Sequence, residues 1–171
     1  MDTKTKRKIK KDFQLPKEFA EKWLAALRSG EYTQIDGTLI SSYEDDDGCS
    51  VAEPTKGCCL GIAALVCNAD PENLIGAGMP KDVSRYLSKI GYPEELLTTA
   101  TVEEGVKTVE DLSTILASLN DGFTLLQLDN WKKHYKKTKF PGEDKFARGS
   151  TRAALSFTEI ADWVSKNVEF V

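Results

Sequence analysis

The sequence predicts a small α+β domain in which helices dominate. The 171 residues suit a single domain. Five segments place apolar residues at helical spacing, and one segment near residues 32–43 is typical of a β-hairpin. Because strands and helices do not alternate regularly along the chain, a parallel α/β sheet is not expected.

Composition narrows the class of protein further. Hydrophobic residues make up 40% of the chain, charged residues 29%, and the net charge is −4. No stretch approaches the roughly 18 apolar residues of a membrane-spanning helix, and no apolar region follows the charged first dozen residues. We therefore expect a cytoplasmic protein without a membrane partner. We expect free thiols, as in a reducing compartment, at the four cysteines Cys49, Cys58, Cys59 and Cys67.

The first expected helix covers residues 16–30. Pro16 suits a helix start because its missing N–H is not needed there, and Gly30 suits a left-handed stop. The segment Tyr32–Tyr43 is rich in residues that favour strands, and Asp36-Gly37 is a hairpin-turn signal within it. The acidic residues 44–48 that follow lack the ligand spacing of a calcium loop and are expected to form a solvated loop.

The most apolar segment covers residues 57–68. Its alanines and its length favour a helix, and because it is apolar all round it is expected to be the buried central helix. Gly61 would let a neighbouring backbone approach closely, and Asn68 would end the helix.

Three more helices are expected. One runs over residues 80–91, and another begins at Thr108, where Thr108 and Asp111 suit a capping box. The last begins at Ser156, where Ser156 and Glu159 form a capping box of the standard kind. Residues 123–128 are ambiguous between strand and helix.

Charge is distributed unevenly. Residues 1–12 hold six basic and two acidic side chains, a net charge of +4, so residues 1–14 are expected to be a basic flexible arm and residues 15–171 a single domain. Within that domain, residues 122–154 read as an inserted basic and aromatic loop, in which residues 131–152 are largely loop.

Three segments together resemble a family of short, mostly hypothetical proteins of tailed bacteriophages and prophages. They are residues 22–32 (KWLAALRSGEY), 57–61 (GCCLG) and 155–163 (LSFTEIADW), with Leu119-Asn120-Asp121 in the expected order. The matched segments cover about a sixth of the chain. The chain departs from the family pattern at residues 122–154 and in its basic arm. The resemblance implies a protein of phage origin in an infected bacterial cell, and it implies no reaction.

Two cysteines suggest a catalytic alternative. Cys58 and Cys59 enter an apolar helix, whose N-terminal dipole favours a thiolate, and the only histidine, His134, would act as base. Asp129, Asn130 or Asn120 would orient that histidine. Buried packing of both thiols is the competing interpretation. No metal site is expected, because the four cysteines lack paired Cys-x₂-Cys spacing.

The basic and aromatic stretch supplies the candidate binding residues. Lysines attract anions, and aromatic rings offer faces on which bases stack. The competing interpretation is that the rings anchor a loop while the lysines face water. The candidates are Trp131, Lys132, Lys133, His134, Tyr135, Lys136, Phe140 and Arg148.

The leading functional hypothesis is therefore a non-catalytic, phage-encoded binding protein. It would sequester or block a host component, either an anionic nucleotide or a host protein, in a counter-defence role, and it needs no cofactor. The alternatives are a cysteine hydrolase or transferase that uses Cys58 or Cys59 with His134, and a nucleic-acid-binding accessory factor that uses the arm and the loop. The oligomeric state is left open.

Overall fold

The fold is α+β, and its described residues form helices together with three small sheets. A computed structural model describes residues 13–75, 81–97, 112–134 and 142–171. The expected capping box at Thr108 lies outside these residues, as does the arm up to residue 12. The described elements in chain order are β1 (Phe13–Leu15), α1 (Lys17–Arg28), β2 (Thr33–Gln34), β3 (Ile40–Glu44), β4 (Ser50–Gly57), α2 (Cys59–Val66), η1 (Pro71–Leu74), α3 (Lys81–Lys89), η2 (Glu94–Leu96), α4 (Leu112–Asp121), β5 (Phe123–Thr124), α5 (Leu125–His134), α6 (Glu143–Ala147), β6 (Arg152–Ala153), α7 (Phe157–Asn167) and β7 (Val168–Phe170).

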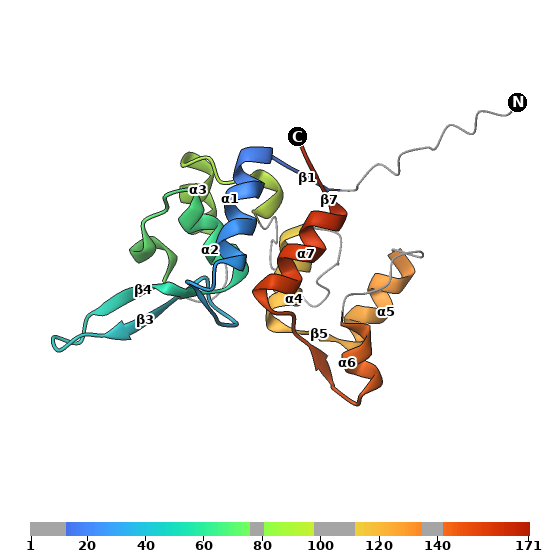
Figure 1. The fold of residues 1–171 in the computed structure, drawn as a ribbon. Helices are drawn as coiled ribbons and strands as arrows, with labels where there is room; N and C mark the ends of the chain where they lie inside the picture. The colour runs from blue at the N-terminus through green and yellow to red at the C-terminus, as the bar shows by residue number, and fades with distance from the viewer. Residues whose placement is uncertain (1–12, 76–80, 98–111, 135–141) are drawn as a thin grey trace, which may run out of the picture.

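The core is built around helix α2. Residues 59–64 of this helix are all buried, as its uniformly apolar sequence predicts. Helix α1 packs against α2 and α7, and α4 packs against the same two helices (Figure 1). After α2 ends, Asn68 has a φ of 61°, a left-handed conformation that asparagine tolerates. The expected central helix and its stop are therefore confirmed.

The two ends of the described chain meet in a parallel pair of strands. Phe13 of β1 lies opposite Val168 of β7, and Leu15 lies opposite Phe170. The Lys17 N–H donates to the carbonyl of Val171 at 2.9 Å, which continues the pairing into α1. Residues 13 and 14 thus belong to the sheet, so the domain begins inside the arm that was expected at residues 1–14.

The β-hairpin lies further along the chain than expected. Strands β3 and β4 form it, and its turn falls in the acidic residues 45–48 rather than at Asp36-Gly37. Strand β2 instead pairs in parallel with the end of β4, where Gln34 lies opposite Gly57. The Gly37 N–H donates to Asp121 Oδ1 at 3.3 Å, so the Asp36-Gly37 bend is attached to α4 and closes no hairpin. Figure 1 shows the β3–β4 hairpin projecting from one side of the fold.

The described residues of the segment 122–154 form a folded unit of short strands and helices and are not largely loop. Residues 123 and 124 form β5, which pairs antiparallel with β6, and α5 and α6 lie between these strands in the chain. The ambiguity at residues 123–128 is thus resolved into two residues of strand followed by a helix. The described chain contains seven α-helices, two more than expected, and both additional helices are in this unit. The α+β class is confirmed.

Candidate functional site

Residues of the segments 22–32, 57–61 and 155–163 contact one another in the core. Trp23 is fully buried, and its indole N–H donates to the carbonyl of Cys59 at 3.0 Å. Arg28, at the end of α1, pairs with Asp162 of α7 at 2.9 Å. Residues from the first segment therefore bind residues of the second and the third, so these segments hold the helices of the core together.

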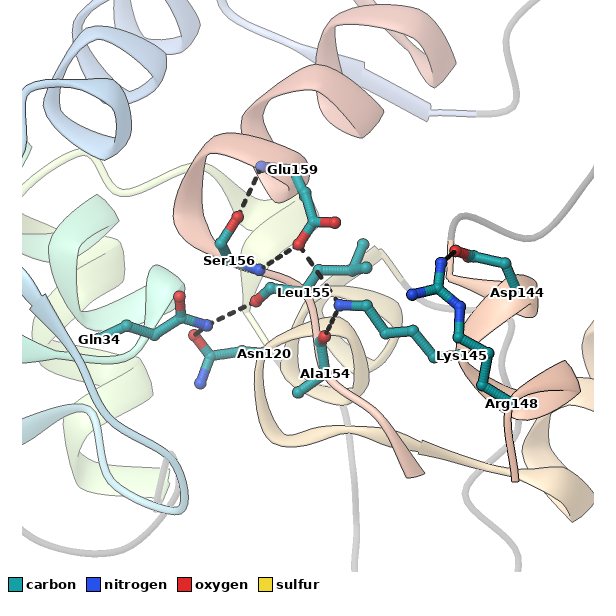
Figure 2. A network of polar contacts seen from close by, with 9 residues as sticks. All are labelled: Gln34, Asn120, Asp144, Lys145, Arg148, Ala154, Leu155, Ser156 and Glu159. Atoms are coloured by element: carbon teal, nitrogen blue, oxygen red, sulfur yellow. Dashed lines mark hydrogen bonds and ion pairs between the residues drawn. The ribbon is translucent and has the colours of Figure 1, made fainter. Parts of the chain in front are cut away.

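Asn120 connects α4 to the start of α2. Its Oδ1 accepts from the backbone N–H of Cys59 at 3.1 Å, and its Nδ2 donates to the carbonyl of Ile35 at 2.7 Å. Gln34 donates to the same Oδ1 at 3.2 Å and to the carbonyl of Leu155 at 2.7 Å (Figure 2). Asn120 is 3% exposed. A side chain that was one candidate for orienting His134 thus serves as a buried junction between backbone segments.

Glycine at position 61 is required by a close approach of two backbone segments. A Cβ atom at Gly61 would lie 1.9 Å from the carbonyl oxygen of Leu39, and one at Gly57 would lie 2.6 Å from it. The same carbonyl accepts from the Cys58 N–H at 3.0 Å. The expectation that Gly61 admits a neighbouring backbone is confirmed.

Both cysteines of the catalytic alternative lie buried at the start of α2. Cys58 is the residue before the helix, and its Sγ accepts from the Gly61 N–H at 3.4 Å. The Cys59 thiol donates to the carbonyl of Leu116 at 3.5 Å. Burial raises the pKa of Cys58 to about 11, and burial also raises the pKa of Cys59 well above its ordinary value. Burial therefore outweighs the helix N-terminus, and the thiol form is favoured in both residues.

The candidate binding residues fall into three groups. Trp131, Lys133 and His134 belong to α5, but their side chains lie outside the described part of the structure, and so does all of the segment that holds Tyr135, Lys136 and Phe140. The side chains of Lys132 and Arg148 are described. Lys132 pairs with Glu143, which joins α5 to α6. Arg148, the residue after α6, pairs with Asp144 of α6 at 2.7 Å.

A third basic residue of this unit is also paired. Lys145 donates to the carbonyl of Ala154 at 2.5 Å and lies 3.5 Å from the carboxylate of Glu159. Figure 2 shows it reaching from α6 to the start of α7. The pairs of Lys132, Lys145 and Arg148 with carboxylates leave less positive charge for a phosphate group than the sequence alone suggests.

Helix α5 exposes two adjacent leucines that the sequence analysis did not select. Thr124 and Gln127 form a capping box: the Thr124 N–H donates to Gln127 Oε1 at 2.9 Å, and the Gln127 N–H donates to Thr124 Oγ1 at 3.3 Å. The box fixes Leu125 and Leu126 as the first two residues of the helix. They are 56% and 72% exposed, while Leu128 is buried. The T-x-x-Q spacing was the sequence signal that could have found them.

The site has no metal-ligand cluster among the described residues and no counterpart among known proteins. Within residues 13–75, 81–97, 112–134 and 142–171, no three metal-ligating side chains cluster. No helix among the described residues has the length and apolar character to cross a membrane. No protein-family model matches the chain, and no curated protein or solved structure is significantly similar to it.

Proposed function

We propose that this chain is a non-catalytic, phage-encoded protein that binds and blocks a host protein in the bacterial cell. The observation that carries the proposal is the exposure of Leu125 and Leu126, called here the leucine pair. Burying a leucine side chain contributes about 1.5–3 kcal/mol, so a partner that covers these two exposed leucines at the start of α5 gains apolar contact.

The leucine pair is held in a fixed position, which favours binding. The Thr124–Gln127 capping box sets the start of α5, and the Lys132–Glu143 pair joins α5 to α6. A partner would therefore meet a surface that needs little ordering, which lowers the entropic cost of association. Resemblance of the three sequence segments to the phage family supports the biological setting.

A host protein is favoured over an anionic nucleotide as the partner. Lys132, Lys145 and Arg148 already have carboxylate partners. A nucleotide phosphate would have to compete with these ion pairs, whereas an apolar partner surface would cover side chains that otherwise face water. The buried, protonated thiols of Cys58 and Cys59 support a role without a nucleophile.

The test is binding by the full chain with a matched surface control. The tagged protein is expressed in bacteria, and co-purifying proteins are quantified for wild type, for Leu125→Ser/Leu126→Ser, and for Tyr43→Ser. Tyr43 is another exposed large side chain, 52% exposed, on β3. We expect one host protein in stoichiometric amount with wild type and Tyr43→Ser, and at least about a tenfold loss with the leucine variant. Equal recovery in all three would contradict the proposal.

Three further readouts separate the alternatives. A nucleotide released from the heat-denatured protein, in the absence of any bound protein, would contradict the choice of partner. For the cysteine enzyme, the Cys58→Ser variant is informative because serine is a strong N-cap and should preserve α2. If folded Cys58→Ser no longer blocks the host component, the enzyme is favoured. If the variant still blocks it, binding is supported. For the nucleic-acid factor, oligonucleotide affinity would have to fall steeply with salt.

A further inference from the structure

Among the residues that the structure describes, strand β3 lies at the edge of its sheet. The sheet has the order β2–β4–β3, and β3 pairs with β4 along its whole length. On its other side, within the described residues, only Ile40 makes a bridge, to Ile75. The rest of this edge, from Ser41 to Glu44, lies in the part of the hairpin that projects from the fold (Figure 1).

A hydrogen bond of Ala52 on β4 shows which backbone groups of β3 point away from the sheet. Its N–H donates to Glu72 Oε1 at 3.0 Å and hence points away from β3. Opposite residues of an antiparallel pair either exchange both hydrogen bonds or point both sets of groups outward. Ser42 lies opposite Ala52, so the N–H and C=O of Ser42 point outward, and those of Glu44 follow at the two-residue repeat. The Asp45 N–H, which donates to the Cys49 carbonyl at 2.9 Å, fits this alternation.

The two edges of the hairpin therefore differ. On β4, the outward N–H of Ala52 already donates to the carboxylate of Glu72 in η1. The outward groups of Ser42 and Glu44 on β3 form a template to which another strand can be added. We call this template the β3 edge. Four successive acidic residues, Glu44 to Asp47, lie at one end of it, so it suits a strand that carries positive charge.

The chain itself contains a segment of this chemistry. Residues 3–11 read Thr-Lys-Thr-Lys-Arg-Lys-Ile-Lys-Lys, with six basic and no acidic side chains. Lysines recur at every second position from Lys4 to Lys10, the period that places side chains on one face of a strand. The described chain begins at β1, which Figure 1 places on the side of the fold away from the hairpin tip. A second copy is therefore the better placed acceptor of this segment.

We infer that residues 3–11 of one copy add as a strand to the β3 edge of a second copy. Backbone hydrogen bonds to Ser42 and Glu44 supply the pairing, and the lysines face the acidic end of the hairpin. Reciprocal exchange of the two segments closes a twofold dimer. This association is independent of the leucine pair and of the proposed host partner.

The test is sedimentation velocity of the full chain at about 50 mM and about 500 mM NaCl, since salt screens charges at these strengths. We expect a dimer at low salt that dissociates at high salt. Two variants address the two sides of the contact. Lys4, Lys6, Lys8 and Lys10 are changed together to Gln, and Asp46→Lys/Asp47→Lys reverses the acidic end. Each is expected to weaken the dimer at least about tenfold.

The matched control is Glu94→Lys/Glu95→Lys, which reverses two adjacent exposed acidic residues at η2. It should change the dimer constant less than about twofold. Ser42→Pro removes one outward N–H and should also weaken the dimer while leaving the β3–β4 hydrogen bonds in place. A monomeric wild type at low salt would overturn the inference. A dimer that survives the lysine changes would also overturn it, even if the edge variants weaken that dimer.

Discussion

The Oδ1 atom of Asn120 lies 3.1 Å from the backbone nitrogen of Cys59, so a side chain of α4 binds an N–H at the start of α2. The first N–H groups of a helix have no partner within it, and a buried helix start needs partners from elsewhere. Asn120 meets that need and also donates to the carbonyl of Ile35. One amide thus fixes three segments that are far apart in sequence.

Replacing this amide should destabilise the fold strongly. We expect Asn120→Ala to lower the free energy of unfolding by about 3 kcal/mol, because it leaves buried backbone groups without partners. Urea denaturation followed by circular dichroism measures this change. Asn167→Ala is the control, since Asn167 makes one hydrogen bond, to the Trp163 carbonyl, from a half-buried position. Its expected cost is below about 1 kcal/mol. Similar costs for the two variants would refute the junction role.

Gly61→Ala should be more harmful than a glycine substitution at a turn. The new Cβ would overlap the Leu39 carbonyl oxygen, a backbone atom that cannot move aside without shifting β3. We expect a loss of at least about 3 kcal/mol, at the upper end of overpacking effects. At Gly30, where φ is +76° and nothing lies within 4 Å of a Cβ, alanine should cost only about 1 kcal/mol. Thermal unfolding of both variants gives the comparison, and equal melting temperatures would be the contrary result.

The thiols should differ in reactivity according to burial. With iodoacetamide near neutral pH, we expect the exposed Cys49 to be modified in the native protein. Cys58 and Cys59 should react only after denaturation, because both are buried and the pKa of each is raised. Peptide mass spectrometry assigns the modified sites. Modification of native Cys58 as fast as Cys49 would revive the catalytic alternative.

The raised pKa of Cys58 also predicts a loss of stability at high pH. The native state holds the Cys58 proton up to about pH 11, whereas the unfolded chain releases it near the ordinary value of 9.0. The unfolded state therefore binds fewer protons between these pH values, and the free energy of unfolding falls as pH rises through this window. We expect Cys58→Ser to reduce the fall by about 2 kcal/mol. Parallel denaturation curves at pH 8 and pH 11 test it, and an unchanged fall in the variant would count against it.

The capping box at α7 gives a smaller, local prediction. The Ser156 hydroxyl accepts from the Glu159 N–H at 3.3 Å, and the Ser156 N–H donates to Glu159 Oε2 at 2.8 Å. Ser156→Ala should cost about 1 kcal/mol in the free energy of unfolding. The matched control is Ser150→Ala, at an exposed residue after α6. It should lower the free energy of unfolding by less than about 0.5 kcal/mol. Chemical denaturation of both variants is sufficient, and no difference between them would reject the cap.

Local signals predicted the helices α1, α2, α3, α4 and α7, and distant contacts decided the strands. The spacing and stops at residues 16–30 and 57–68 predicted α1 and α2, because a helix makes its hydrogen bonds within a few residues. The Asp36-Gly37 signal failed because the Ile35 N–H donates to Gly57 and the Gly37 N–H donates to Asp121. Neither partner can be read from the segment itself. The start of α5 was missed because exposed leucines do not form the apolar stripe of a buried helix face.

In the candidate site too, some features follow from the sequence and others only from the tertiary structure. The sequence by itself determined the class of the fold, the buried central helix and the unequal distribution of charge, since each follows from residue types and short-range spacing. Only the tertiary structure decided that Cys58 and Cys59 are buried, that Lys132 and Lys145 are paired with carboxylates, and that Leu125 and Leu126 face solvent. Burial and ion pairing depend on which distant segments meet, and that choice is made by the packing of the whole chain.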